Sequence, residues 1–109
     1  MDERLQAILR LALKYHATDI HINTKFQETD IEMRIDNVMH EVRAKADDYK
    51  LVRYIKYLAN MDVSRKLIPQ TSEFEMEIDG KLLKLRYAII DNECFSDSVL
   101  RILNTYEEV

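Results

Sequence analysis

The sequence has little glycine, proline, cysteine and tryptophan: one glycine, one proline, one cysteine and no tryptophan among 109 residues. A single glycine, Gly80, cannot form the glycine-rich loop of a P-loop ATPase or a dinucleotide-binding fold, because several glycines must let the backbone approach the phosphates. A single cysteine excludes an internal disulfide and favours a cytosolic setting. The apolar runs are far shorter than the roughly 20 residues of a membrane span. The sequence therefore predicts a cytoplasmic domain that is not inserted in a membrane.

The balance of charge argues against direct binding of nucleic acid. Lysine and arginine number 16 and aspartate and glutamate 20, which gives a net charge of −4 and an isoelectric point of about 5.4. A duplex-binding domain normally carries a basic face and a high isoelectric point. The histidines and Cys94 have no paired metal-ligand spacing, so no metal site is expected. With 47% apolar residues, the chain has the composition and size of one folded domain over residues 1–109.

Two segments have the apolar spacing of amphipathic helices. Residues 3–16 form the first, with Asp2 as the expected N-cap. Residues 48–61 form the second. The stretch 62–71, which contains Pro69, is expected to connect this helix to the next strand.

Six segments alternate polar and apolar residues as strands do. The predicted strands cover 19–23, 30–35, 38–42, 73–78, 81–90 and 99–103. Asp36-Asn37 and Asp79-Gly80 are typical of two-residue hairpin turns, which sets Met33 opposite His40 and Glu73 opposite Arg86. The remaining loops are placed at 24–29 and 91–97, with fraying from residue 105 onward. We therefore expect an α+β fold, a mainly antiparallel six-stranded sheet with both helices packed on one face.

Three arginines lie inside predicted strands, each between apolar residues that must face the core. Arg34, Arg86 and Arg101 should therefore point away from the core. One interpretation is cross-strand ion pairing, as for Arg86 with Glu73. The other is a row of guanidinium groups offered to the phosphate or carboxylate of a partner, which suits the bidentate geometry of arginine.

The histidines and the cysteine are given structural interpretations. His21 shares the polar side of its strand with Asp19, where a structural hydrogen bond is favoured over catalysis. His40 falls on the apolar side and is expected to be buried. Cys94 is expected to be an unreactive loop thiol, because the negative charges of Glu93 and Asp97 near it disfavour the reactive thiolate.

Several segments, in order, resemble one family, the ATPases that assemble secretion systems and type IV pili. Ala17-Thr18-Asp19-Ile20-His21-Ile22 resembles that family's Ala-Ser-Asp-Ile-His-Ile signature. The other similar segments are the hairpin at 33–39, Ile68-Pro69-Gln70, and the two arginine-bearing strands at 83–87 and 99–103. The resemblance covers roughly residues 5–103.

The resemblance implies a PAS-like N-terminal domain that precedes a P-loop core, closest to the competence branch of Gram-positive bacteria. The parent protein would be a hexameric cytoplasmic ATPase that drives pilus or pseudopilus assembly for secretion or DNA uptake, recruited by partners to the inner face of the membrane. ATP and magnesium would belong to that parent. This chain alone would bind no cofactor and hydrolyse nothing. Its partners would be the core domain, neighbouring subunits and proteins of the pilus or secretion machinery.

The resemblance also implies roles for individual residues. Arg86 and Arg101 match arginines that reach the nucleotide held by the core. An interface is implied for five further residues: Arg34, Asp19, His21, Pro69 and Gln70. Glu73 departs from the family by standing where a basic residue is frequent, and the loop 91–98 scarcely matches the family's pattern. The alternative is a free-standing PAS-like module that binds a small ligand or a protein.

Overall fold

The chain folds as a single sheet backed by two helices. The computed structural model describes residues 1–63 and 68–107. Its elements are α1 (Asp2–Lys14), β1 (Asp19–Lys25), β2 (Glu28–Ile35), β3 (Val38–Val42), the 3₁₀ turn η1 (Asp48–Lys50), α2 (Leu51–Leu58), β4 (Gln70–Ile78), β5 (Lys81–Asp91) and β6 (Phe95–Glu107). The strands lie in the order β3-β2-β1-β6-β5-β4, and all neighbours are antiparallel. The predicted α+β class is confirmed.

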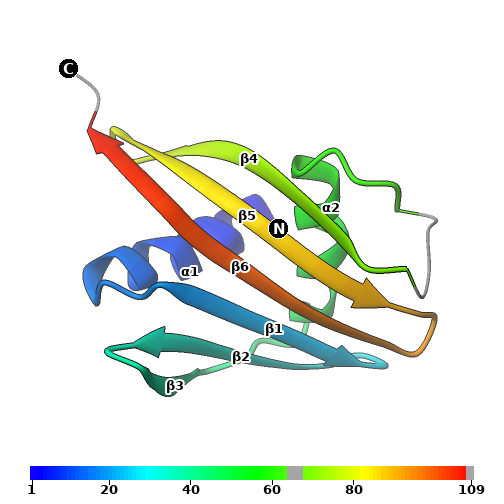
Figure 1. Cartoon of the computed structure of the whole chain (residues 1–109). Helices are drawn as coiled ribbons and strands as arrows, with labels where there is room; N and C mark the ends of the chain where they lie inside the picture. The colour runs from blue at the N-terminus through cyan, green and yellow to red at the C-terminus, as the bar shows by residue number, and fades with distance from the viewer. Residues whose placement is uncertain (64–67, 108–109) are drawn as a thin grey trace.

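Both helices lie on the same side of the sheet, so the sheet has one covered and one open face (Figure 1). The alternation of side chains along each strand sends every second residue into the core between sheet and helices. The buried apolar residues include Leu5, Ile8 and Leu9 of α1, Leu51 and Ile55 of α2, and Ile20, Ile22, Ile31, Leu83, Leu85 and Leu100 of the sheet. Burying each such side chain contributes roughly 1.5–3 kcal/mol. No helix in the described part of the chain has the length and apolarity that a membrane crossing requires.

The predicted hairpin registers are confirmed. Met33 lies opposite His40 across β2 and β3, and Glu73 lies opposite Arg86 across β4 and β5. The turn residues adopt the left-handed backbone that a two-residue hairpin requires. Asp36 has φ of 51° and Gly80 has φ of 78°. Short polar residues and glycine tolerate that region best, which is why these two turns could be found from the sequence.

Two other connections are tighter than predicted, because the strands extend into them. β1 and β2 leave only Phe26 and Gln27 between them, rather than a loop over 24–29. Phe26 takes φ of 55° and donates its N–H to the carbonyl of Cys94 at 2.7 Å. Phenylalanine is not a turn-forming residue, so the sequence carried no turn signal here.

The loop between β5 and β6 spans only residues 92–94, where the sequence predicted 91–97. The Asn92 side-chain oxygen accepts the N–H groups of Cys94 and Phe95 at 2.7 and 2.8 Å, which closes the loop. β6 also continues to Glu107, beyond the point where fraying was expected. The reason is its pairing with β5, which reaches from Asp91 back to Lys81 with one register shift between Lys84 and Leu85.

Three smaller predictions were wrong. Asp2 is the first residue of α1 rather than its N-cap, and its carboxylate accepts hydrogen bonds from Gln6 and Tyr54. α2 ends at Leu58, short of residue 61. His40 is exposed, because β3 is an edge strand and the covering helices do not bury it. The connector 62–71 lies partly outside the described residues.

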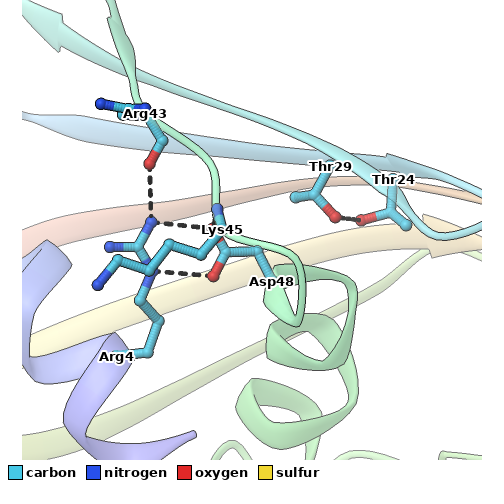
Figure 2. Close-up of polar contacts among 6 residues, drawn as sticks. All are labelled: Arg4, Thr24, Thr29, Arg43, Lys45 and Asp48. Carbon is cyan, nitrogen blue, oxygen red and sulfur yellow. Dashed lines mark hydrogen bonds and ion pairs between the residues drawn. The ribbon is translucent and has the colours of Figure 1, made fainter.

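A charged cluster on the covered side joins α1 to the segment before α2 (Figure 2). Arg4 donates from Nε and Nη2 to the two oxygens of Asp48, at 2.8 and 2.9 Å, and also from Nη2 to the carbonyl of Arg43. The N–H of Lys45 donates to Asp48 as well, at 2.8 Å. In the same view the hydroxyls of Thr24 and Thr29 share a hydrogen bond that joins β1 to β2. The Arg4–Asp48 cluster thus joins the segment between β3 and α2 to the first helix.

Candidate functional site

Charged side chains form a straight line across the open face of the sheet. In strand order from β2 to β4, the aligned residues are Arg34, Asp19, Arg101, Arg86 and Glu73. Each is directly opposite the next across an antiparallel pair, so all project to the same side. The three arginines that the sequence placed away from the core are thus brought together. We call Arg34, Arg101 and Arg86 the arginine row.

Asp19 lies between two members of the arginine row and contacts both. Its Oδ1 accepts from Nε of Arg101 at 2.7 Å, and its Oδ2 lies 3.5 Å from Nε of Arg34. The Thr18 hydroxyl donates weakly to Oδ2, at 3.4 Å. The Asp19 side chain is only 9% exposed, whereas those of Arg101 and Arg34 are 54% and 39% exposed. The hydrogen bond and charge of Asp19 raise the pKa of Arg101 above its ordinary value.

Arg86 has a separate carboxylate partner at the other end of the line. Its Nη2 donates to Oε1 of Glu73 at 2.8 Å, so the predicted cross-strand ion pair is confirmed. The hydrogen bond from Arg86 lowers the pKa of Glu73, assisted by the charges of Lys84 and Arg86. Both partners are 42% exposed, so the pair lies at the surface, where such interactions contribute little to stability.

The arginine row borders a shallow depression of about 350 Å³ in the open face. Ala88 and Val99 line it together with His21, Asp19 and the three arginines. A second depression, of about 470 Å³, adjoins the first along His21, Ala88 and Val99 and reaches Pro69 and Gln70. The side chain of Gln70 projects to the covered side, as does that of the buried Ile89 opposite it, and its Nε2 donates to the carbonyl of Asp62 at 3.2 Å.

All seven residues selected from the sequence therefore line two contiguous depressions, although the side chain of Gln70 points to the covered side of the sheet. The sequence reasoning did not identify Ala88 and Val99, which form the apolar part between the arginines and Pro69. The sequence signal for them was weak, because Leu82 and Ile90 of β5 are also apolar residues on the open side. His21 is half-buried and lies opposite Val99 and Glu32.

The donors of the arginine row are of the kind that can bind an oxyanion. A guanidinium carries five N–H donors in a planar fork, and those that do not contact Asp19 or Glu73 remain at the exposed ends of the arginine row. Within residues 1–63 and 68–107, no group of three or more His, Cys, Asp or Glu side chains is arranged to hold a metal ion. Cys94 is exposed in the loop between β5 and β6.

Comparison with known proteins identifies one matching family and several relatives. The family model described as type II/IV secretion system protein matches residues 1–108. The chain is 31% identical over 102 residues to the type II secretion system protein E of Dickeya dadantii (strain 3937). The aligned region covers 92% of this chain and 20% of that protein. It is 30% identical over 102 residues to the type II secretion system ATPase E of Vibrio cholerae serotype O1, with the same coverage of each chain.

A third relative is the protein transport protein HofB homolog of Escherichia coli (strain K12), which is 32% identical over 103 residues. The aligned region covers 93% of this chain and 22% of that protein. The chain thus spans about a fifth of the length of the curated relatives that it matches.

Proposed function

Because the chain belongs to the family of type II/IV secretion system proteins, we propose that residues 1–109 are the PAS-like N-terminal domain of a cytoplasmic assembly ATPase. The domain packs its open sheet face on a P-loop core and contributes Arg86 and Arg101 to the nucleotide site of that core. Among the three relatives named above, that of Vibrio cholerae has a name that states an activity, that of an ATPase. The parent protein would act as a hexamer, with a pilus, secretion or competence machine as its partner.

One observation carries this proposal, namely the arginine row on the face that no helix covers. The three arginines line a common depression on that face. Guanidinium groups at such a place can bind the phosphates of a nucleotide held by a facing domain and stabilise the charge that develops during hydrolysis. ATP and magnesium would be held by the core, since one glycine cannot form a P-loop in this chain.

The proposal is tested by replacing the two arginines in the parent protein. Arg86→Ala or Arg101→Ala should lower the rate of ATP hydrolysis by at least about tenfold while the circular dichroism spectrum stays unchanged, because arginines that reach a transferred phosphoryl group are worth that much or more. The matched control is Arg53→Ala, since Arg53 is exposed on α2, on the covered side. Unchanged turnover in both open-face variants would overturn the nucleotide role.

The second candidate function is a free-standing adaptor that binds a small ligand or a protein. An apolar depression of about 260 Å³ favours it, lined by Leu11, Tyr15, Met33, Ile35, His40, Glu41 and Val42. The reading frame beyond Val109 separates the candidates. A Gly-x-x-x-x-Gly-Lys-Ser/Thr sequence within about 50 residues supports the ATPase domain, whereas a stop codon directly after Val109 supports the adaptor.

A further inference from the structure

We propose that Asp19 is the positioning residue of an oxyanion site built from all three members of the arginine row, with Arg34 as its third arginine. This inference rests on the proposed function but extends it, because it assigns an organising carboxylate and an additional cation. The ligand class is a polyphosphate or another compact polyanion. The site would be formed by this chain alone, before any second domain contributes to it.

The first argument is the way in which Asp19 contacts the arginines. Both contacts are made to Nε, the nitrogen nearest the aliphatic stem, at 2.7 Å for Arg101 and 3.5 Å for Arg34. A carboxylate that holds Nε fixes the plane of the guanidinium while leaving terminal N–H donors available. Asp19 thus holds Arg101 by a hydrogen bond and Arg34 by a longer ion pair, and its nearest contact with each is Nε rather than a terminal nitrogen.

The second argument is that Asp19 is itself rigidly held. It is 9% exposed at the side chain and lies in the middle of the sheet, with Arg34 opposite it on one side and Arg101 on the other. Thr18 beside it is tied to both flanking strands, since its N–H donates to the carbonyl of Arg34 and its carbonyl accepts from Ile102. A fixed anchor of this kind reduces the conformational entropy that two long side chains lose on binding a ligand.

The third argument is the place of Arg34. It lines the same depression as Arg101 and Arg86, and its side chain is 39% exposed, so its terminal nitrogens are accessible. The line holds three guanidinium groups and two carboxylates, with Asp19 between Arg34 and Arg101 and with Arg101 directly beside Arg86, which leaves a net positive charge along it. A compact anion with several oxygens would bridge neighbouring guanidinium groups and neutralise that excess.

The direction in which Asp19→Asn changes the affinity for an anion separates a positioning role of Asp19 from simple charge neutralisation. If Asp19 only neutralised the arginines, Asp19→Asn would remove a negative charge beside the site and strengthen anion binding. If Asp19 positions them, the same variant frees two side chains and weakens binding. We expect inorganic triphosphate to bind about two- to tenfold more weakly to Asp19→Asn, the cost of immobilising one or two long side chains.

The experiment uses the 109-residue chain, inorganic triphosphate at low ionic strength, and the Nε–Hε resonances of its arginines in NMR spectra. In the wild type, triphosphate should shift the signals of Arg34, Arg101 and Arg86 together. Asp79→Asn is the matched control, because it removes one charge and one Asp–Arg pair, with Arg10, away from the open face. That control should leave the affinity unchanged.

A second variant keeps the inference testable if Asp19→Asn does not fold. Arg101→Lys retains the positive charge but removes the Nε donor that Asp19 holds. Positioning predicts weaker binding of triphosphate by this variant too, whereas a requirement for charge alone predicts no change. The inference is overturned if the wild-type chain shows no triphosphate shifts at the arginine row, or if Asp19→Asn binds as tightly as the wild type.

These outcomes are distinguishable from failure of the proposed function. If Arg86→Ala leaves ATP hydrolysis by the parent protein unchanged while triphosphate still binds this chain in an Asp19-dependent way, the nucleotide role is wrong and the anion site stands. If hydrolysis depends on Arg86 and Arg101 but not on Asp19, and Asp19→Asn binds triphosphate normally, the positioning role is wrong and the nucleotide role stands.

Discussion

Two aspartates in this fold each bind arginine, and they do so in opposite ways. Asp48, on the covered side, receives Nε and Nη2 of Arg4 and the backbone N–H of Lys45, and Arg4 gives its remaining contact to the carbonyl of Arg43 (Figure 2). Their side chains are 1% and 15% exposed. Asp19, on the open face, accepts from Nε of Arg101 and from the Thr18 hydroxyl and pairs with Nε of Arg34, and both arginines are themselves well exposed.

The difference lies in how many donors are left after the ion pair forms. In the Arg4–Asp48 cluster the donors are turned inward and used within the fold, which is what a structural link between two elements needs. In the arginine row the carboxylate is buried and the outer donors are not. An ion pair whose carboxylate is rigid and whose cations stay accessible is therefore the better candidate for ligand binding.

The largest effect is expected from breaking the buried cluster. Arg4→Ala leaves Asp48 as a buried carboxylate without its main partner, so the free energy of unfolding should fall by roughly 3 kcal/mol. Unfolding in urea, followed by circular dichroism, measures the change. The control is Arg10→Ala, because Arg10 of the same helix pairs with Asp79 at the surface, where the two side chains are 49% and 61% exposed. Equal losses in the two variants would show that burial of Asp48 adds nothing.

The next effect is a dependence of stability on acid. Burial acts to raise the pKa of Asp48, but the hydrogen bonds from Arg4 and Lys45 outweigh it, and the pKa is lowered overall. A carboxyl whose folded pKa lies below its unfolded value stabilises the fold above about pH 4 and loses that contribution as the pH falls further. The difference in unfolding free energy between the wild type and Asp48→Asn should therefore shrink below about pH 4. A difference in unfolding free energy that stays constant below about pH 4 would contradict this prediction.

Much of this fold could be predicted from the sequence, because each strand and turn carries a local signal. The hairpins at Asp36-Asn37 and Asp79-Gly80 combine period-two alternation with residues that accept a positive φ, and both registers were correct. Phe26 carries no such signal, since its left-handed turn is stabilised by a bond to the distant carbonyl of Cys94. His40 was misplaced because alternation gives the side of a strand but not whether a helix covers that edge.

The sequence predicts which way the side chains of the site point, but it does not predict that they come together. The sequence shows that Arg34, Arg86 and Arg101 point away from the core, since the residues beside them must point inward. It does not show that β1 inserts between β2 and β6, because strand order depends on contacts among residues more than 60 positions apart. Only that order places Asp19 between two arginines.

The smallest effect is expected from replacing Glu73. This replacement tests most directly how Glu73 differs from Asp19. Glu73→Gln removes the same charge from the open face as Asp19→Asn does. Glu73, however, is exposed and binds a terminal nitrogen of Arg86, so it competes with an incoming anion for that donor. The variant should keep the wild-type stability and bind triphosphate about twofold more tightly, measured by the same NMR titration. Weaker binding would place Glu73 with Asp19 as an organiser, because loss of charge alone can only favour the anion.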